Sequence, residues 1–355
     1  MPTKTLTVIL NALLLGCAAH AQMQRIVVQG SGAPQVFTEV STAIAAAQNG
    51  DKLYFSGGTH LSPTSIIIDK ELHFIGAGIH PDSASTTSTT TLSTLSGSIQ
   101  ITTPASGSTF TGLVFSPAAS DMQIGTSTAD DDATGLLFER CRWVKNMVLS
   151  SGSQGGSSST FNECIFDNVI VYGWNLGNGA EFDRCIFYSN GSWAIHNVAP
   201  LTVDHCVFLN SRVCRDSPGA IVGNSISTSA NDGQFYQSGG STITNCIFTN
   251  GDPTANSNAG GFIFTDNQVG VPLSPLFVSE VDGVFQFTDN LEMEAGSPGI
   301  GAADDGTDAG IHGSSTPYKL GAVPYNPHFR NATIAPATDA NGDLPVSIRV
   351  AAQTH

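Results

Sequence analysis

Positive charge is scarce in this sequence. Thirteen lysine and arginine residues stand against 29 aspartate and glutamate residues, which gives a net charge of −16 at pH 7. A surface this acidic repels phosphate backbones and anionic lipid headgroups, so we expect neither nucleic acid nor an anionic membrane as a partner. It also disfavours acidic polysaccharides, unless basic side chains gather in one cleft. The simpler interpretation is that the acidity keeps an exported protein soluble.

Long hydrophobic runs are absent beyond the N-terminus, where one extends from Leu6 to Gly16. This run is too short to span a bilayer, so we expect no transmembrane segment. Lys4 precedes it and Ala19-His20-Ala21 follows as a small-x-small cleavage site, which predicts a signal peptide over residues 1–21 and secretion. Alternatively, Leu14-Leu15-Gly16-Cys17 resembles a bacterial lipobox, which would leave a lipid anchor on Cys17. Both interpretations predict export.

Cysteine pairs of the Cys-x-x-Cys type and His/Cys clusters are also absent, so nothing predicts a zinc site. Instead, one phrase recurs, consisting of an aromatic or aliphatic residue, two polar residues, Cys, any residue and an aromatic residue. Its cysteines are 23, 21, 21 and 40 residues apart, and the last gap holds a degenerate copy, Ile221–Ile226, with Asn224 in the cysteine position. A period of about 20 to 25 residues is typical of a solenoid. The full copies are Phe138–Trp143, Phe161–Phe166, Phe182–Phe187, Val203–Phe208 and Ile243–Phe248.

Helical periodicity is missing from these repeats, which decides between the classes of solenoid. Apolar residues lie two apart around each cysteine, and this is the period of a strand. Turn-forming clusters such as Ser189-Asn190-Gly191 and Thr249-Asn250-Gly251 separate the copies. The pattern predicts an all-β protein, a single right-handed parallel β-helix over residues 22–325. We expect residues 326–355, with the alternating strand Leu344 to Val350, to form a closing strand or cap.

The repeated cysteines are expected to stack as a ladder of buried thiols inside the coil. In-register parallel neighbours point their Cβ atoms the same way, which is poor disulfide geometry. Buried cysteine behaves as a small hydrophobic residue. Asn224 in the same position predicts an inward-facing asparagine. Cys214 lies outside the ladder and has no predicted role.

One helix is predicted near the N-terminus, where Val40, Ile44 and Ala47 fall on one stripe and Asn49-Gly50 would end it. A solenoid needs such a cap because its open end exposes core and unpaired strand edge. This helix with its Gly-Asp-strand-Gly-Thr continuation resembles the N-terminal cap of the pectin-lyase-like β-helix superfamily. Leu72–Asp82 resembles a rung and loop of secreted bacterial β-helix proteins, and Ser297–Ala302 through Asp308-Ala309-Gly310 resembles their closing phrase.

The resemblance covers roughly residues 25 to 325 and implies the fold more strongly than an activity. Members of the superfamily include polysaccharide lyases, which use Arg or Lys as a base and often Ca²⁺, hydrolases that use acidic residues, and adhesins. Neither catalytic constellation matches this chain residue by residue.

Three sets of residues are candidates for a site. The first is a column just before the cysteines, in which Arg184 or His205 would act as a base beside Asp183 and Asp204. The alternative is a surface strip of alternating charge that satisfies itself, with each pair contributing at most about 1 kcal/mol. The full column is Arg140, Glu163, Arg184 and His205, with Glu139, Asp183 and Asp204 one position earlier.

The second set is aromatic. Tyr172 and Trp174 on one rung, and Trp193 and His196 on the next, would form a platform for sugar rings. The alternative is that each tryptophan covers a neighbouring turn.

The third set consists of clustered carboxylates that suit Ca²⁺, which takes six to eight oxygen ligands. They are Asp130, Asp131 and Asp132 in one loop, and Asp304, Asp305 and Asp308 near the closing phrase, where a structural role in a cap is the alternative.

Three hypotheses of function follow for what we expect to be an exported monomer. The first is a protein that presents a sheet face to extracellular glycans or the cell surface. The second is a polysaccharide lyase or glycoside hydrolase, and the third is an adhesin or structural spacer that needs no cleft. The tight repeats from Cys141 to Cys206 leave no large insertions to build groove walls, which favours the first.

Overall fold

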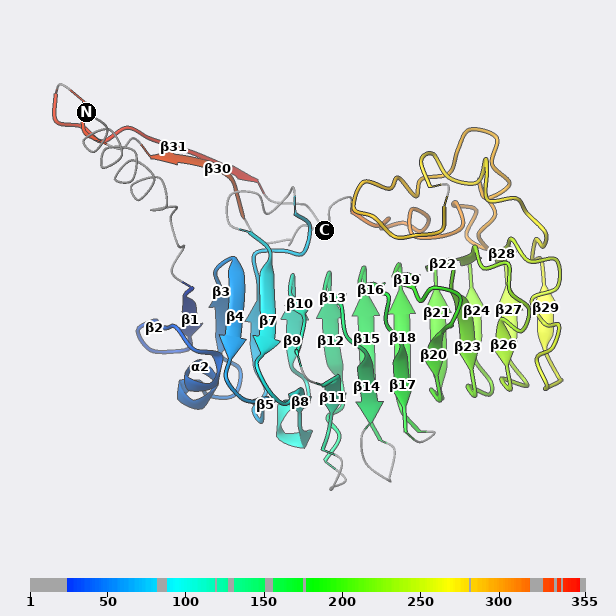
Figure 1. Cartoon of the computed structure of the whole chain (residues 1–355), viewed down its shortest axis with the longest axis horizontal. Coiled ribbons are helices and arrows are strands. Elements are labelled where there is room, and N and C mark those ends of the chain that lie inside the picture. Colours follow the sequence, from blue (N-terminus) through cyan, green and yellow to red (C-terminus); the bar gives the residue numbers. More distant parts are fainter. Residues whose placement is uncertain are drawn as a thin grey trace, which may run out of the picture.

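The computed structural model describes residues 24–351 except 82–87, 119, 127–130, 151–155, 175–176, 281, 320–327, 335–336 and 340. It confirms the predicted all-β parallel solenoid, whose coils follow one another along the long axis of the molecule (Figure 1). The predicted signal peptide, Cys17 and Asp130 lie outside the described residues. Within the described ranges, no helix is long and apolar enough to cross a membrane.

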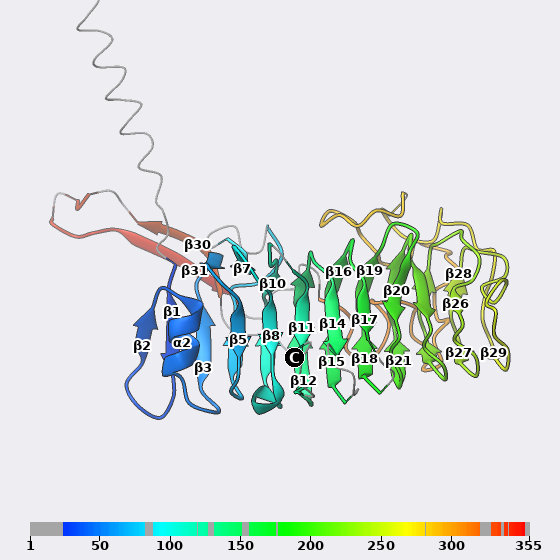
Figure 2. The ribbon, with the colours of Figure 1, turned by 60° about the horizontal axis from the view of Figure 1, so that its bottom comes forward.

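Three sheets form the sides of the coil, and each coil contributes one strand to each sheet in the order C, A, B. In spatial order, sheet A consists of β2 (Gln35–Phe37), β1 (Ile26–Gln29), β3 (Lys52–Phe55), β6 (His73–Ile75), β9 (Thr109–Thr111), β12 (Leu136–Glu139), β15 (Ser158–Asn162), β18 (Gly179–Asp183), β21 (Leu201–Asp204), β24 (Ile221–Gly223), β27 (Thr242–Thr244) and β29 (Ile263–Thr265). The strands of the three sheets are parallel except at the N-terminal end of sheet A, where β1 pairs antiparallel with β2 and β3. Sheet B consists of β4 (Gly58–Ser62), β7 (Thr90–Thr94), β10 (Val114–Phe115), β13 (Arg142–Trp143), β16 (Ile165–Asp167), β19 (Ile186–Tyr188), β22 (Val207–Leu209), β25 (Ile226–Ser227) and β28 (Ile247–Phe248). Sheet C consists of β5 (Ile66–Ile68), β8 (Ile99–Ile101), β11 (Met122–Ile124), β14 (Met147–Ser150), β17 (Val171–Gly173), β20 (Trp193–His196), β23 (Arg212–Arg215) and β26 (Phe235–Tyr236), and its strands lie side by side in Figure 2.

Two columns of stacked aromatic rings fill the core. Within a column the ring centroids are about one strand spacing apart, as between Phe138 and Phe161 at 5.0 Å and between Phe166 and Phe187 at 4.7 Å. The columns meet edge to face, as between Phe161 and Phe166 at 5.6 Å. The aromatic residues at the two ends of the repeated phrase therefore form the centre of the protein.

The predicted thiol ladder is confirmed, since all five repeat cysteines are free and buried. Each thiol donates to a backbone carbonyl, as Cys164 does to Asn162 at 3.4 Å. The prediction that Asn224 faces inward in the cysteine position is wrong. The register pairs Val203 with Val222, which places Ser225 in the cysteine position, and its hydroxyl accepts the backbone N–H of Cys206 at 3.0 Å. Asn224 falls one residue earlier, at the bend between sheets A and B.

The N-terminal cap is confirmed as the single α-helix of the described residues, α2 (Val40–Ala46), which lies against β1 at one end of the solenoid (Figure 1). Val40, Ala43 and Ile44 are buried. The helix ends earlier than predicted, because Ala47 is already extended. Its free carbonyls are satisfied by the Lys70 ammonium, which donates to the carbonyls of residues 44, 45 and 47 at 2.8 to 3.0 Å.

After β29 the chain turns back and packs across the outer face of sheet B (Figure 1). We call residues 271–319 the C-terminal cover. It consists almost entirely of turns and bends, and Leu276, Phe277, Leu291 and Ile311 are buried. Beneath it lies a column of outward-facing apolar side chains, one from each successive strand of sheet B: Ile165, Ile186, Val207, Ile226 and Ile247.

Two further elements are described. One is the 3-10 helix η1 (Thr103–Ala105), which follows β8, and the other is a hairpin near the C-terminus. The hairpin pairs β30 (His328–Ile334) with β31 (Val346–Ala351) in antiparallel fashion, apart from the three sheets. The strand predicted from Leu344 to Val350 is therefore present in part, and its side chains are exposed.

Candidate functional site

An outward column of polar and aromatic side chains crosses four adjacent strands of sheet C. The register pairs Tyr172 with His196, His196 with Arg215 and Arg215 with Tyr236. The alternate, inward positions are core residues, including Cys214, which is fully buried and so accounted for by packing. We call the outward group the aromatic–arginine face, which comprises Tyr172, Trp174, Trp193, His196, Arg212, Arg215 and Tyr236.

The Trp193 ring supports other side chains of this face. Its indole Nε1 donates to the Gly233 carbonyl at 2.8 Å, which fixes the ring. The guanidinium carbon of Arg212 lies 3.4 Å from the ring centroid and that of Arg215 lies 5.0 Å from it, so both cations are held by their attraction to the ring. Trp193 therefore supports two arginines, and Arg212 covers one side of the ring that was predicted to stack on sugars.

The two arginines differ in how their charge is compensated. Arg215 donates to the Asp216 carboxylate at 2.9 Å. Arg212 donates through Nε to the Gly191 carbonyl at 3.1 Å, but it makes no ion pair with any residue that the structure describes. Partial burial and the neighbouring Arg215 lower the pKa of Arg212 from its ordinary value. Arg212 is thus a positive charge of this face without a carboxylate partner among the described residues.

Trp174 is the exposed aromatic residue of the face, with 65% of its surface accessible. Its ring lies 6.3 Å from that of Tyr172, whose hydroxyl donates to Asp121 at 2.9 Å. His196 contacts the Trp193 carbonyl through Nε2 at 3.0 Å. Burial, reinforced by Arg215, lowers the pKa of His196 to about 4, so its imidazole is neutral at pH 7. The four predicted residues are therefore brought together.

The predicted column of alternating charge occupies the bend between sheets A and B. Arg140, Glu163, Arg184 and His205 have φ angles of 51°, 52°, 50° and 47°, a left-handed conformation that costs about 1–2 kcal/mol for residues other than glycine and asparagine. These side chains point away from the core, but the prediction of a solvent-exposed surface strip is wrong. Arg140 is 0% exposed and His205 3%, because the C-terminal cover lies over them.

A buried Arg–Glu–Arg cluster results. Arg140 Nε lies 2.9 Å from one carboxylate oxygen of Glu163, and Arg184 Nη2 lies 3.9 Å from the other. The backbone N–H of Lys319, in the cover, donates to the same carboxylate at 3.3 Å. Glu163 therefore ties its own coil to both neighbouring coils and to the cover.

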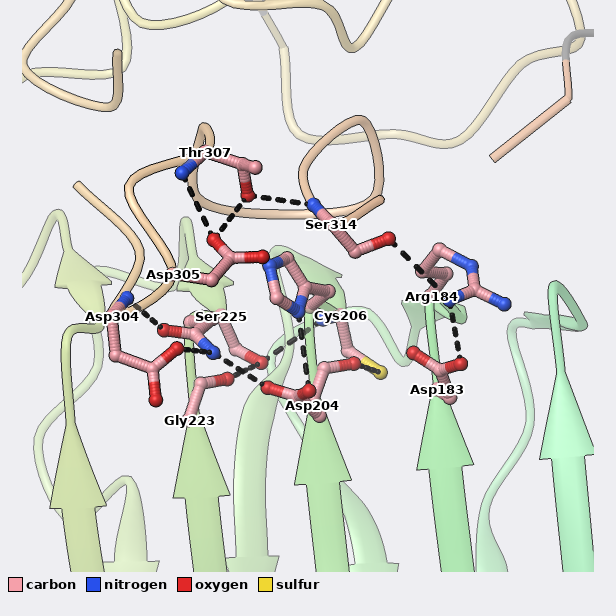
Figure 3. A network of polar contacts seen from close by, with 12 residues as sticks. Asp183, Arg184, Asp204, Cys206, Gly223, Ser225, Asp304, Asp305, Thr307 and Ser314 are labelled. Carbon is pink, nitrogen blue, oxygen red and sulfur yellow. Dashed lines mark hydrogen bonds and ion pairs between the residues drawn. The ribbon is translucent and has the colours of Figure 1, made fainter. Parts of the chain in front are cut away.

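Further along the bend, Asn224 joins the solenoid to the cover. Figure 3 shows the surrounding network, in which Asp183 and Asp204 of sheet A lie below Asp305 and Ser314 of the cover. Its side-chain amide donates to Asp204 and to Asp304, both at 2.9 Å, and its amide oxygen accepts the backbone N–H of Asp304 at 3.0 Å. His205 Nδ1 lies 3.2 Å from Asp204. Arg184 pairs with Asp183 at 2.7 Å and contacts Ser314 of the cover at 3.5 Å. The structure thus brings all four predicted catalytic candidates together.

Asp183 and Asp204 are in-register neighbours on β18 and β21, with side chains 34% and 46% exposed. Burial raises the pKa of Asp183 to about 6, and Asp204 acts in the same direction against the attraction of Arg184. Partial burial also acts on Asp204, but its contacts with His205 and Asn224 hold its pKa below the usual value. Neighbouring carboxyl groups with divergent pKa values can serve as acid and base.

Three of the predicted calcium ligands are engaged in local turns, whereas Asp304 is held by Asn224 of the solenoid and Asp132 is buried. Asp131 accepts from Thr126, Asp305 from Thr307, and Asp308 from the backbone N–H of Gly301. Among the described residues no three His, Cys, Asp or Glu side chains converge as a metal site. Calcium binding stays a prediction, and Asp130 lies outside the described residues.

Sequence reasoning missed Arg212, Arg215 and Tyr236, because their neighbourhood with Trp193 depends on the register of sheet C. Trp193 and Arg212 are paired although they are only 19 residues apart. The preceding cysteines are 21 residues apart, so counting from them does not predict this pairing. No family model matches the chain, and no curated protein is significantly similar to it.

Proposed function

We propose that this is an exported, right-handed β-helix protein of the pectin-lyase-like superfamily that binds extracellular glycans on the aromatic–arginine face. The observation that carries the proposal is the outward row of side chains on sheet C, which extends from the exposed Trp174 ring beside Tyr172 to the two arginines stacked on Trp193. Sugar rings pack on exposed aromatic rings, and stacking on Trp193 orders the arginines before a ligand binds.

Acidic sugars fit this face best. Arg212 has no carboxylate partner among the described residues, and a guanidinium can bind a carboxylate or sulfate through two parallel hydrogen bonds. The overall negative charge of the chain opposes acidic polysaccharides elsewhere on the surface. Binding of acidic sugars is therefore expected only beside Arg212.

Replacing Trp174 by alanine is expected to weaken glycan binding about tenfold, because a stacked ring contributes roughly 1–1.5 kcal/mol. Arg212→Gln should weaken binding of uronate-containing glycans and leave neutral ones unchanged. Affinity electrophoresis through gels that contain individual polysaccharides would measure both effects. Ile221→Ala, which removes an exposed apolar side chain from sheet A, is the matched control. Unchanged mobility for Trp174→Ala and Arg212→Gln in every retarding gel would contradict the proposal.

A second candidate, glycoside hydrolysis at Asp183 and Asp204, is favoured by their divergent pKa values. A cleft of about 320 Å³ lies on the same outer face of sheet A, lined among others by Thr160, Glu181 and Thr202. Adjacent strands are about 4.8 Å apart, close to the about 5–5.5 Å carboxyl separation of retaining glycosidases. In this scheme Asp183 is the acid and Asp204 the nucleophile.

If this second activity exists, reducing ends should be released from a panel of neutral and acidic polysaccharides, and Asp183→Asn or Asp204→Asn should abolish the release. The rate should fall above about pH 6, because the acid Asp183 loses its proton there. Asp252→Asn, in an exposed loop, is the control. A rate that both variants retain would exclude this pair.

A further inference from the structure

A cleft of about 240 Å³ lies between the outer face of sheet B and the C-terminal cover, away from the aromatic–arginine face on sheet C. Ile165 and Ile186, from adjacent strands of sheet B, form its floor. Phe285, Phe287 and Leu291 of the cover form its walls. Its lining is thus supplied by sheet B, by the cover and by His80, three parts of the chain that are far apart in the sequence.

The size of the cleft restricts its occupant. An engineered cavity of about 150 Å³ takes up benzene, and drug-sized ligands need about 300–1,000 Å³. The volume here fits one substituted ring and excludes an oligosaccharide. A ligand of this cleft is therefore of another class than the glycans proposed above.

The walls are held in place before any ligand arrives. The Phe287 ring meets the Phe285 ring edge to face at 5.2 Å and the His80 ring at 4.8 Å. Arg142 lies over Phe287 at 4.9 Å and pairs with Asp167. Aromatic rings arranged in this way pack well against the edge or face of another planar ring.

One lining residue, His312, has a ring nitrogen that makes no hydrogen bond to the described residues. Nε2 of His312, which lines the cleft beside Tyr318, is buried and has no hydrogen-bond partner among the described residues. Burial lowers the pKa of His312, so its imidazole is neutral at pH 7 and offers one donor or acceptor. A buried nitrogen of this kind gains by pairing with a hydroxyl group.

The charge of the cleft disfavours anions. Asp289 is part of the lining, its carboxylate accepts the backbone N–H of Gln286 at 2.6 Å, and burial raises its pKa. Its side chain contacts that of Glu280, which is 1% exposed. A negatively charged ligand would meet Asp289 in the lining, and Arg142, the cation that lies over Phe287, is already paired with Asp167.

We propose that this cleft binds a small uncharged phenol, whose ring lies on Ile165 and Ile186 between the phenylalanines and whose hydroxyl hydrogen-bonds Nε2 of His312. This site is independent of the glycan-binding proposal, because it lies on another sheet and takes a different class of ligand.

Fluorine NMR titration of the full chain with 4-fluorophenol, fluorobenzene and 4-fluorobenzoate tests the proposal. The phenol is expected to bind saturably and about three- to tenfold more tightly than fluorobenzene, the effect of one hydrogen bond, with benzoate weakest. His312→Leu should remove the preference for the phenol over fluorobenzene. Equal binding of the two to the wild type would overturn the choice of ligand, as would a preference that His312→Leu retains.

Filling the cleft locates the site. Ile186→Phe should abolish binding of the phenol, whereas Ile67→Phe, the same exchange at an exposed position of sheet C, should not. If Ile186→Phe does not fold, Leu291→Phe fills the cleft from the cover. Binding that survives in a folded cleft-filling variant, or no saturable binding to the wild type, would overturn the proposal.

Discussion

Replacing Glu163 by alanine is expected to destabilise the protein by about 3–5 kcal/mol, the usual cost of removing one partner from a buried ion pair. The Glu163 side chain is 3% exposed and lies between Arg140, which is 0% exposed, and Arg184. Without the carboxylate, two guanidinium groups remain under the cover with no shared counter-ion. Chemical denaturation followed by circular dichroism would measure the loss.

The control for this prediction removes both charges. Arg140→Met combined with Glu163→Met should recover most of the lost stability, because well-packed apolar residues often replace a buried ion pair at little cost. The same series tests the link to the cover. Because the Glu163 carboxylate accepts the backbone N–H of Lys319, Glu163→Ala should also accelerate proteolysis within residues 271–319. A loss of stability below 1 kcal/mol would show that the cluster is not important for folding.

The inside of the coil was predictable from the sequence because each inward position recurs in every repeat. Phe161, Cys164 and Phe166 occupy the same places as their counterparts one coil away, and stacking equal side chains at the strand spacing needs no information beyond the period. The degenerate copy shows the limit. Ser225 and Asn224 are both small and polar, and only the pairing of Val203 with Val222 decides which one faces inward.

The outside of the coil was harder to predict, although one signal was present. The residue between each cysteine and the following aromatic is Arg142, Ile165, Ile186, Val207 or Ile247, so four of the five outward positions on sheet B are apolar. Apolar side chains on a sheet exterior predict a covering segment. What covers them could not be inferred, because residues 271–319 form turns without a repeating period.

The candidate site was likewise predictable only in part. Tyr172 and His196 could be placed on neighbouring rungs by counting from the cysteines. The arginines could not, because nothing in the sequence indicates that Arg212 lies on the Trp193 ring. The burial of Arg140 and His205 was likewise unpredictable, since it depends on the path of the cover and not on their own repeats.

Ending the chain after Gly270 is expected to expose the outer face of sheet B and to have the largest effect of any change considered. Five isoleucine and valine side chains would lose their cover, and burial of each contributes about 1.5–3 kcal/mol, so the gross loss is roughly 7–15 kcal/mol. That sum equals the whole net stability of a typical domain, about 5–15 kcal/mol. We expect aggregation or strong binding of a hydrophobic dye, measured by size-exclusion chromatography and dye fluorescence.

The matched truncation ends the chain after Lys319 and keeps the whole cover. It removes the hairpin, whose described apolar side chains Val346, Ile348 and Val350 are exposed and contribute little by burial. This shorter cut should leave a soluble protein that unfolds at nearly the wild-type temperature and still binds 4-fluorophenol. If the protein that ends after Gly270 were equally soluble and stable, the cover would be a detachable segment, and the cleft beneath it would have no fixed walls. The structure predicts the opposite, because Asn224 and Glu163 hold the cover through hydrogen bonds from buried positions of the solenoid.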